Sequence, residues 1–137
     1  MAYQTRVLFV CVANAARSQL AEALLRHTDP ENFVAFSAGT EPGEVDPRTV
    51  EALRSLGVDS RGLRSKSIDE FRFDEFEYII SLCDKSAAEC QNLPFEGEKL
   101  AWHFEDPVSS TKPDAFRHCL HEIHERIKMF VLVKTKR

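Results

Sequence analysis

The most informative stretch of the sequence runs from residue 7 to residue 18 and reads VLFVCVANAARS. Its first four residues form a continuous apolar run, which is typical of a strand buried on both faces of a parallel sheet. Beyond the stretch, apolar residues recur at helical spacing at Leu20, Ala21, Leu24 and Leu25. The sequence therefore predicts a strand, a short loop and a helix in direct succession.

Strands and helices continue to alternate along the chain. We expect further strands at residues 33–36, 78–82 and 100–104, and the first of these is stopped by Ser37, Ala38 and Gly39. Helix starts are indicated by capping residues at Asp46 with Pro47, at Ser67 and at Ser86, and Gly57 ends the second helix. A final helix after Pro113 has a core-facing stripe made of Phe116, Cys119, Leu120, Ile123, Ile127 and Phe130. This order predicts one α/β domain over residues 1–137, with a parallel sheet covered on both faces.

The bulk composition excludes some classes of partner. The formal net charge of −4 leaves no basic excess to neutralise a nucleic acid backbone, and no apolar run approaches the length of a membrane span. Residues 6–15 could be read as a secretory leader, but the apolar region is short and only Arg6 precedes it. We therefore expect a cytoplasmic protein whose four cysteines are kept reduced unless they turn over chemically.

The loop between the first strand and the first helix has a cysteine, five residues and an arginine. Five intervening residues can curl so that their N–H groups converge on the positive end of the helix. We expect an oxyanion to bind the residues of this loop, which are Val12, Ala13, Asn14, Ala15, Ala16, Arg17 and Ser18. The same field favours a thiolate, which makes Cys11 a nucleophile, with Ser18 as its hydrogen-bond donor and Asn14 in a left-handed conformation. The alternative is a buried cysteine and a surface arginine that fall six residues apart by chance.

Other candidate residues follow the later strands, whose carboxyl ends meet at one edge of a parallel sheet. Asp106, followed by Pro107, is a candidate general acid for a departing oxygen, the alternative being an ordinary turn. Cys83 and Cys90 are seven residues apart, which is roughly 10 Å in a helix, so pairing them requires the segment between them to distort. They form either a redox switch or two isolated structural cysteines.

The remaining singled-out residues have simpler interpretations. Cys119 and Trp102 are expected in the core, whereas the role of His103 stays open. His121 and His124 do not match the zinc-binding pattern in which a glutamate and two residues separate the histidines, so we expect a solvated face and no metal site.

The anion loop, the Ser37-Ala38-Gly39 run, the Cys83 and Cys90 pair and Asp106-Pro107 together resemble the low-molecular-weight protein tyrosine phosphatase fold family. Within it, the cysteine pair and the Arg17-Ser18-Gln19 run are most similar to the thioredoxin-coupled arsenate reductases. The resemblance implies a three-layer sandwich with a four-stranded parallel sheet of order 2-1-3-4. It departs at Ala13, Ala15 and Ala16, where the family usually has other residues.

For chemistry, the resemblance implies a relay of three cysteines. Cys11 attacks arsenate while Arg17 and the loop amides hold the oxygens and Asp106 protonates the departing one. Cys83 then attacks Cys11 and releases arsenite. Cys90 attacks Cys83 in turn, which leaves a Cys83–Cys90 disulfide for thioredoxin to reduce. No tightly bound cofactor is implied. The alternatives are hydrolysis of phosphomonoesters such as phosphotyrosine, and an oxyanion sensor without turnover.

Overall fold

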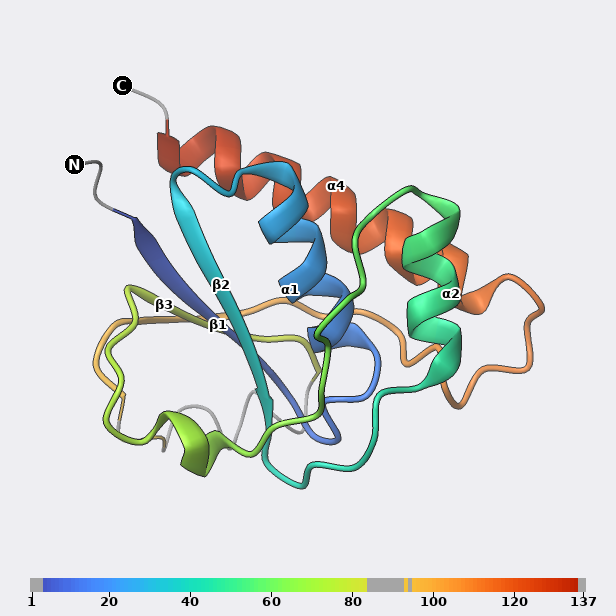
Figure 1. Ribbon diagram of the computed structural model, residues 1–137, viewed down its shortest axis with the longest axis horizontal. Helices are drawn as coiled ribbons and strands as arrows, with labels where there is room; N and C mark the ends of the chain where they lie inside the picture. The colour runs from blue at the N-terminus through green and yellow to red at the C-terminus, as the bar shows by residue number, and fades with distance from the viewer. Residues whose placement is uncertain (1–3, 84–92, 94, 136–137) are drawn as a thin grey trace.

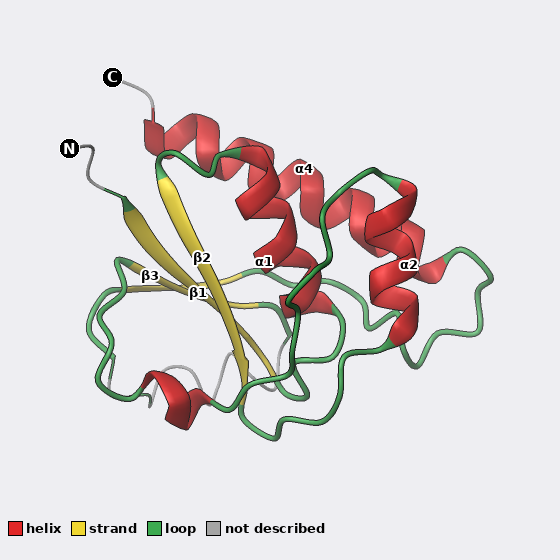
Figure 2. Ribbon diagram, viewed as in Figure 1, coloured by secondary structure: helices red, strands yellow, loops and turns green. Residues whose placement is uncertain are grey.

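The computed structural model describes residues 4–83, 93 and 95–135 and has an α/β architecture (Figure 1). Four strands are present: β1 (Thr5–Cys11), β2 (Phe33–Gly39), β3 (Tyr78–Ser81) and β4 (Glu98–Ala101). The helices are α1 (Arg17–Thr28), α2 (Pro47–Ser55) and α4 (Ala115–Thr135), with a 3₁₀ turn at Ile68–Phe71. Figure 2 shows α1, α2 and α4 on one side of the strands and the 3₁₀ turn on the other.

The four strands form one sheet in the order β2-β1-β3-β4, and every pairing is parallel. This confirms the predicted topology. β1 lies between β2 and β3, with Cys11 opposite Gly39 and Val10 opposite Ser81. The apolar run of β1 is fully buried, as expected of a strand covered on both faces. Cys11 is therefore the last residue of a central strand, at the carboxyl edge of the sheet.

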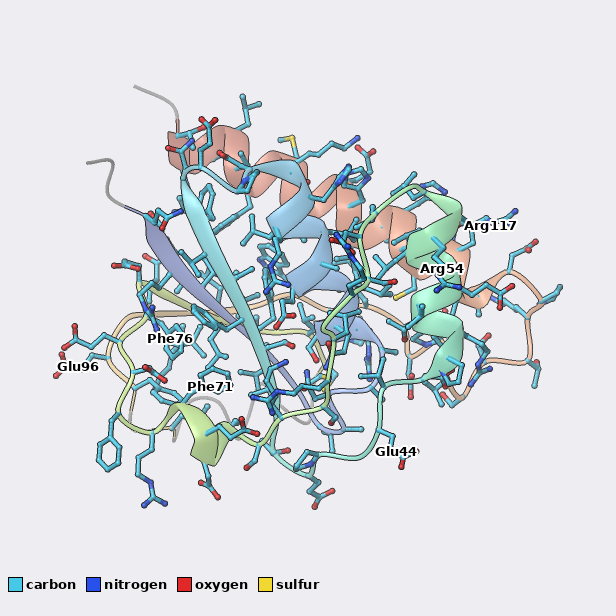
Figure 3. The ribbon with its side chains drawn as sticks, viewed as in Figure 1. Glu44, Arg54, Phe71, Phe76, Glu96 and Arg117 are labelled. Carbon is cyan, nitrogen blue, oxygen red and sulfur yellow. The ribbon has the colours of Figure 1, made fainter. Side chains whose placement is uncertain are left out.

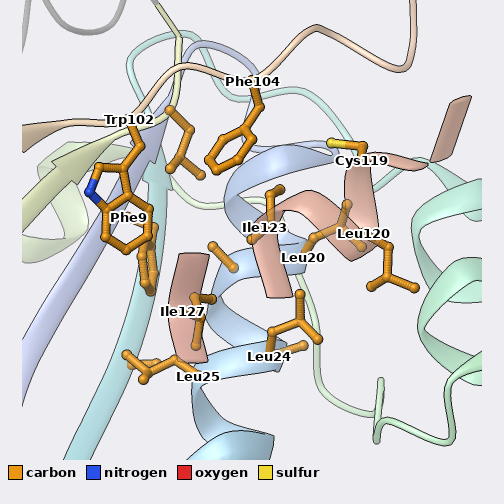
Figure 4. Close-up of a cluster of buried hydrophobic side chains, with 14 of the residues drawn as sticks. Phe9, Leu20, Leu24, Leu25, Trp102, Phe104, Cys119, Leu120, Ile123 and Ile127 are labelled. Atoms are coloured by element: carbon orange, nitrogen blue, oxygen red, sulfur yellow. The ribbon is translucent and has the colours of Figure 1, made fainter. Parts of the chain in front are cut away.

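The two faces of the sheet are packed differently. On one face, side chains of α1 and α4 form the larger core with Phe9 and Trp102 (Figure 4). The face of α4 that is buried consists of the six residues predicted from its apolar stripe. On the opposite face, Leu8 and Val10 pack against Phe71, Phe76 and Phe95, and Figure 3 shows Phe71 and Phe76 beside the sheet near the 3₁₀ turn. Edge-to-face aromatic pairs such as Phe76 with Phe95, whose ring centres are 5.6 Å apart, fill this smaller layer.

Some predicted boundaries were wrong. β2 does not stop at residue 36 but continues through Ser37 to Gly39, because it pairs with β1 as far as Cys11 opposite Gly39. The fourth strand occupies Glu98–Ala101 instead of residues 100–104, since β3 offers partners only up to Ser81. Trp102 follows β4 and is a core residue as expected. The helix expected from Ser86 lies outside the described residues.

The capping signals at Asp46, Gly57 and Ser67 were confirmed. Asp46 caps α2 by accepting a hydrogen bond from the Arg48 amide at 2.9 Å, and Pro47 is the first helical residue. Gly57 follows α2 with a φ of 75°. Ser67 caps the 3₁₀ turn in the same way, through the Asp69 amide at 3.1 Å. In the part of the chain that the structure describes, no helix has both the length and the apolar character that a bilayer span requires.

Candidate active site

The candidate site is the anion loop, residues 11–18, which connects β1 to α1. Cys11 is 4% exposed, and its Sγ lies 2.8 Å from the hydroxyl oxygen of Ser18, the second residue of α1. The sequence predicted Arg17 and Ser18 in the loop, but they are the first two residues of α1. The N-terminus of this helix therefore lies next to Cys11. A hydroxyl donor at this distance stabilises negative charge on the sulfur.

The carbonyl groups of the anion loop are bound from outside. Those of Cys11, Val12, Ala13 and Ala15 accept hydrogen bonds from the amides of Thr40, Glu41, Gly43 and Asp46, at 2.8 to 3.3 Å. Within residues 4–83, 93 and 95–135, the amides of residues 12–18 donate to no acceptor. The loop is therefore held by its carbonyls, and its N–H groups remain available as donors to a ligand. Such an arrangement is suited to a tetrahedral oxyanion.

Asn14 gives the anion loop its curvature. Its φ of 53° places it in the left-handed region, as predicted for this residue. The fully buried side chain is bound on both sides, because Nδ2 donates to Ser18 Oγ at 2.7 Å and Oδ1 accepts from Gln19 Nε2 and the Lys66 amide. Since Asn14 donates to the Ser18 oxygen, the Ser18 hydroxyl hydrogen is available to Cys11.

Gly39 permits β2 to approach the loop closely. A Cβ atom at this position would lie 2.6 Å from the Val12 oxygen and 3.0 Å from Asn14 N, which is too close for any side chain. This explains why glycine ends the Ser37-Ala38-Gly39 run at this point.

Arg17 and Asp106 lie close together at the edge of the sheet where the carboxyl ends of the parallel strands meet. The Arg17 Nη1 donates to the Phe104 carbonyl at 2.8 Å, and Nη2 is 4.0 Å from Asp106 Oδ2. Asp106 is partly exposed and is oriented by the Val108 amide, which donates to Oδ1 at 2.9 Å. The guanidinium is thus fixed beside a carboxyl group that is open to solvent.

The other cysteines differ in their placement. Cys83 is buried two residues beyond the end of β3, the strand beside β1. Cys90 lies outside the described residues. Cys119 is a core residue, and burial raises its pKa to about 12, so its thiol is not a nucleophile at neutral pH. Cys11 and Cys83 thus lie at the carboxyl ends of neighbouring strands, β1 and β3.

Sequence reasoning missed the polar residues behind the loop. Gln19, Glu22, Ser37, Thr49 and Lys66 are all buried. Thr49 donates to the Ala15 carbonyl at 2.9 Å and Gln19 donates to both oxygens of Asn14. In the sequence these residues look like ordinary surface residues, and only the runs that contain Gln19 and Ser37 had been noted.

A cavity of about 330 Å³ lies beside Asp106, between Pro107 and the first turns of α4. Its walls include Ser110, Lys112 and His118. His118 is exposed and pairs with Glu122 at 3.3 Å. The described residues contain no group of three or more histidine, cysteine or acidic side chains placed to hold a metal ion.

Comparisons with known proteins agree with this geometry. The model of the low molecular weight phosphotyrosine protein phosphatase family matches residues 6–137. An arsenate reductase from Halalkalibacterium halodurans is 31% identical over 129 residues, which cover 90% of this chain and 93% of the relative. A solved arsenate reductase in its phosphate-binding state has a TM-score of 0.80 and 28% identity, covering 95% of this chain and 98% of that one. A thioredoxin-dependent arsenate reductase from Corynebacterium glutamicum has a TM-score of 0.75 and 28% identity, covering 98% of this chain and 64% of that one.

Proposed function

The chain belongs to the low molecular weight phosphotyrosine protein phosphatase family, and from this premise we propose that it reduces arsenate to arsenite in the cytoplasm. The observation that carries the proposal is the set of amides of residues 12–18, which have no acceptor among the described residues, next to a cysteine sulfur 2.8 Å from the Ser18 hydroxyl oxygen. The curated relatives with the same fold are named arsenate reductases, which favours this reaction over the others that such a loop could support.

In the first step, the Cys11 thiolate attacks arsenic, so that a sulfur–arsenic bond forms and an arsenic–oxygen bond breaks. The departing oxygen leaves as water after Asp106 supplies a proton. The amides of the anion loop and the Arg17 guanidinium bind the remaining oxygens, and the guanidinium adds a planar pair of donors. Thr49 and Asn14 hold the loop in the shape that this requires.

In the second step, the Cys83 thiolate attacks the Cys11 sulfur. A disulfide forms, the electron pair of the sulfur–arsenic bond passes to arsenic, and arsenite departs. Cys90 then attacks the Cys83 sulfur and releases Cys11 as a thiolate, which leaves a Cys83–Cys90 disulfide. A dithiol protein of the thioredoxin class reduces that bond, so that arsenate and a dithiol become arsenite, a disulfide and water.

The test is consumption of NADPH by the protein with arsenate, thioredoxin and thioredoxin reductase. We expect turnover in the wild type and in Cys119→Ala, because that thiol lies in the core, and none in Cys11→Ser or Cys83→Ser. Full turnover in Cys83→Ser, or no turnover in the wild type, would contradict the proposal.

One observation favours hydrolysis of phosphomonoesters as a second activity. The cavity of about 330 Å³ beside Asp106 is much larger than a departing hydroxide needs and could receive the organic part of an ester. Hydrolysis needs Cys11, Arg17 and Asp106 but neither Cys83 nor Cys90. We therefore expect p-nitrophenyl phosphate turnover to survive in the Cys83→Ser, Cys90→Ser double variant, and its loss there would contradict this second activity.

A further inference from the structure

A short segment, residues 64–66, lies against the anion loop and is called the support segment below. The Ser65 hydroxyl donates to the Ala13 carbonyl at 3.0 Å, and the Lys66 amide donates to Asn14 Oδ1 at 2.8 Å. The Lys66 carbonyl accepts from the Gly39 amide at 2.8 Å. The support segment therefore makes hydrogen bonds both to the anion loop and to Gly39 at the end of β2.

The Lys66 side chain is buried behind this segment. Its ammonium lies 2.8 Å from the Arg64 carbonyl and 3.4 Å from both Ser37 Oγ and Glu22 Oε1. The lysine and glutamate side chains are 9% and 5% exposed. Burial of a charged pair is costly unless both groups are well bonded, so these contacts fix the ammonium in one place. Through it, α1, β2 and the support segment are tied together.

Three hydrogen bonds connect Lys66 to the nucleophile. They run from the Lys66 amide to Asn14 Oδ1 at 2.8 Å, from Asn14 Nδ2 to Ser18 Oγ at 2.7 Å, and between Ser18 Oγ and Cys11 Sγ at 2.8 Å. Asn14, which lies on this path, is the residue in the left-handed conformation. Displacement of the support segment would therefore alter both the curvature of the anion loop and the donor to the cysteine.

We infer that Lys66 is a positioning residue for the anion loop: its buried ammonium holds the support segment, which holds Asn14 and thereby the Ser18 donor at Cys11. This inference rests on the proposed oxyanion chemistry at Cys11. A lysine that only contributed to stability would leave anion binding and cysteine reactivity unchanged in the folded protein. The two roles are therefore separable by experiment.

The experiment compares Lys66→Met with Arg26→Met. Both variants remove a cation from Glu22, because Arg26 Nη2 lies 3.5 Å from the other carboxylate oxygen, but only Lys66→Met removes the ammonium that holds the support segment. Phosphate affinity is measured by titration calorimetry, and alkylation of Cys11 by iodoacetamide is followed by mass spectrometry across pH. We expect Lys66→Met to weaken phosphate binding by about tenfold or more and to move the alkylation profile to higher pH. Arg26→Met should stay within about twofold of the wild type.

The Glu22→Gln, Lys66→Met double variant provides a second test if Lys66→Met does not fold. It leaves no unpaired buried charge, yet it still lacks the ammonium that binds the Arg64 carbonyl. Phosphate affinity equal to that of the wild type in this variant, or an equal loss in Arg26→Met, would overturn the inference. Neither measurement uses arsenate or a thiol reductant. Absence of arsenate turnover in the wild type would therefore refute the proposed function without deciding the role of Lys66.

Discussion

Replacement of Gly39 by alanine should damage the anion loop without changing any polar side chain. The added Cβ would lie 2.6 Å from the Val12 oxygen, whereas ordinary contact begins at 3.4 Å. The carbonyl must therefore move by about 0.8 Å. The atoms that the new Cβ would meet are the Val12 oxygen and the N and Cβ atoms of Asn14. None of them is the end of a flexible side chain, so the backbone of the loop must move.

The size of the effect follows from this displacement. Overpacking of a tightly packed site costs about 1–3 kcal/mol of folding free energy. A misplacement of about 1 Å at a reacting centre can lower the rate by about 100-fold. We therefore expect Gly39→Ala to remain folded, to bind phosphate at least about tenfold more weakly, and to lose most of its turnover with arsenate.

Gly43→Ala is the matched control. Its amide also bonds to the anion loop, through the Ala13 carbonyl at 3.0 Å, but no described heavy atom lies within 4 Å of a Cβ built there. Phosphate titration and arsenate turnover should leave this variant close to the wild type. If Gly39→Ala binds phosphate as tightly as Gly43→Ala, the loop does not require the close approach of β2, and the reasoning fails.

Three further predictions concern single side chains. Asp106→Asn should lower turnover by about 10²- to 10⁴-fold while phosphate affinity is retained, and equal turnover at saturating arsenate would exclude Asp106 as the acid. Asp46→Ala should cost about 1 kcal/mol in urea denaturation, and because the hydrogen bond from Arg48 lowers the pKa of Asp46, this difference should shrink as the pH falls below the ordinary value of 3.8. Burial raises the pKa of Cys119 from 9.0 to about 12, so its neutral thiol contributes stability below pH 9 that is lost between pH 9 and 12. Denaturation at pH 8 and pH 11 should show a smaller alkaline loss in Cys119→Ala than in the wild type.

The sequence predicted the features that depend on local pattern. The continuous apolar run before Cys11 predicted a strand buried on both faces, and the apolar stripe of α4 predicted which side of that helix faces the core. The spacing of Cys11 and Arg17 predicted a loop that ends in a helix, and Asn14 was expected in the conformation that it adopts.

The polar layer behind the loop could not be predicted in this way. Lys66 stands in a run of polar residues, and a buried lysine looks the same in the sequence as an exposed one. Its partner Glu22 is flanked in the sequence by the buried residues Ala21 and Ala23. Its burial goes with a contact to Ser37 on another element, which the local sequence does not reveal. The end of β2 was misplaced because it depends on pairing with β1, which continues to Cys11 opposite Gly39.

The amides of residues 12–18 have no acceptor among the described residues. The stability of the protein should therefore depend on which anions the solution contains. An anion that binds only the native state raises the free energy of unfolding, by about 2.7 kcal/mol when its concentration is a hundred times its dissociation constant. Melting temperatures in phosphate and in a non-coordinating buffer should therefore differ, and the difference measures occupancy of the loop. Under the proposed function phosphate and arsenate bind the same amides, so that added phosphate should slow the turnover of arsenate.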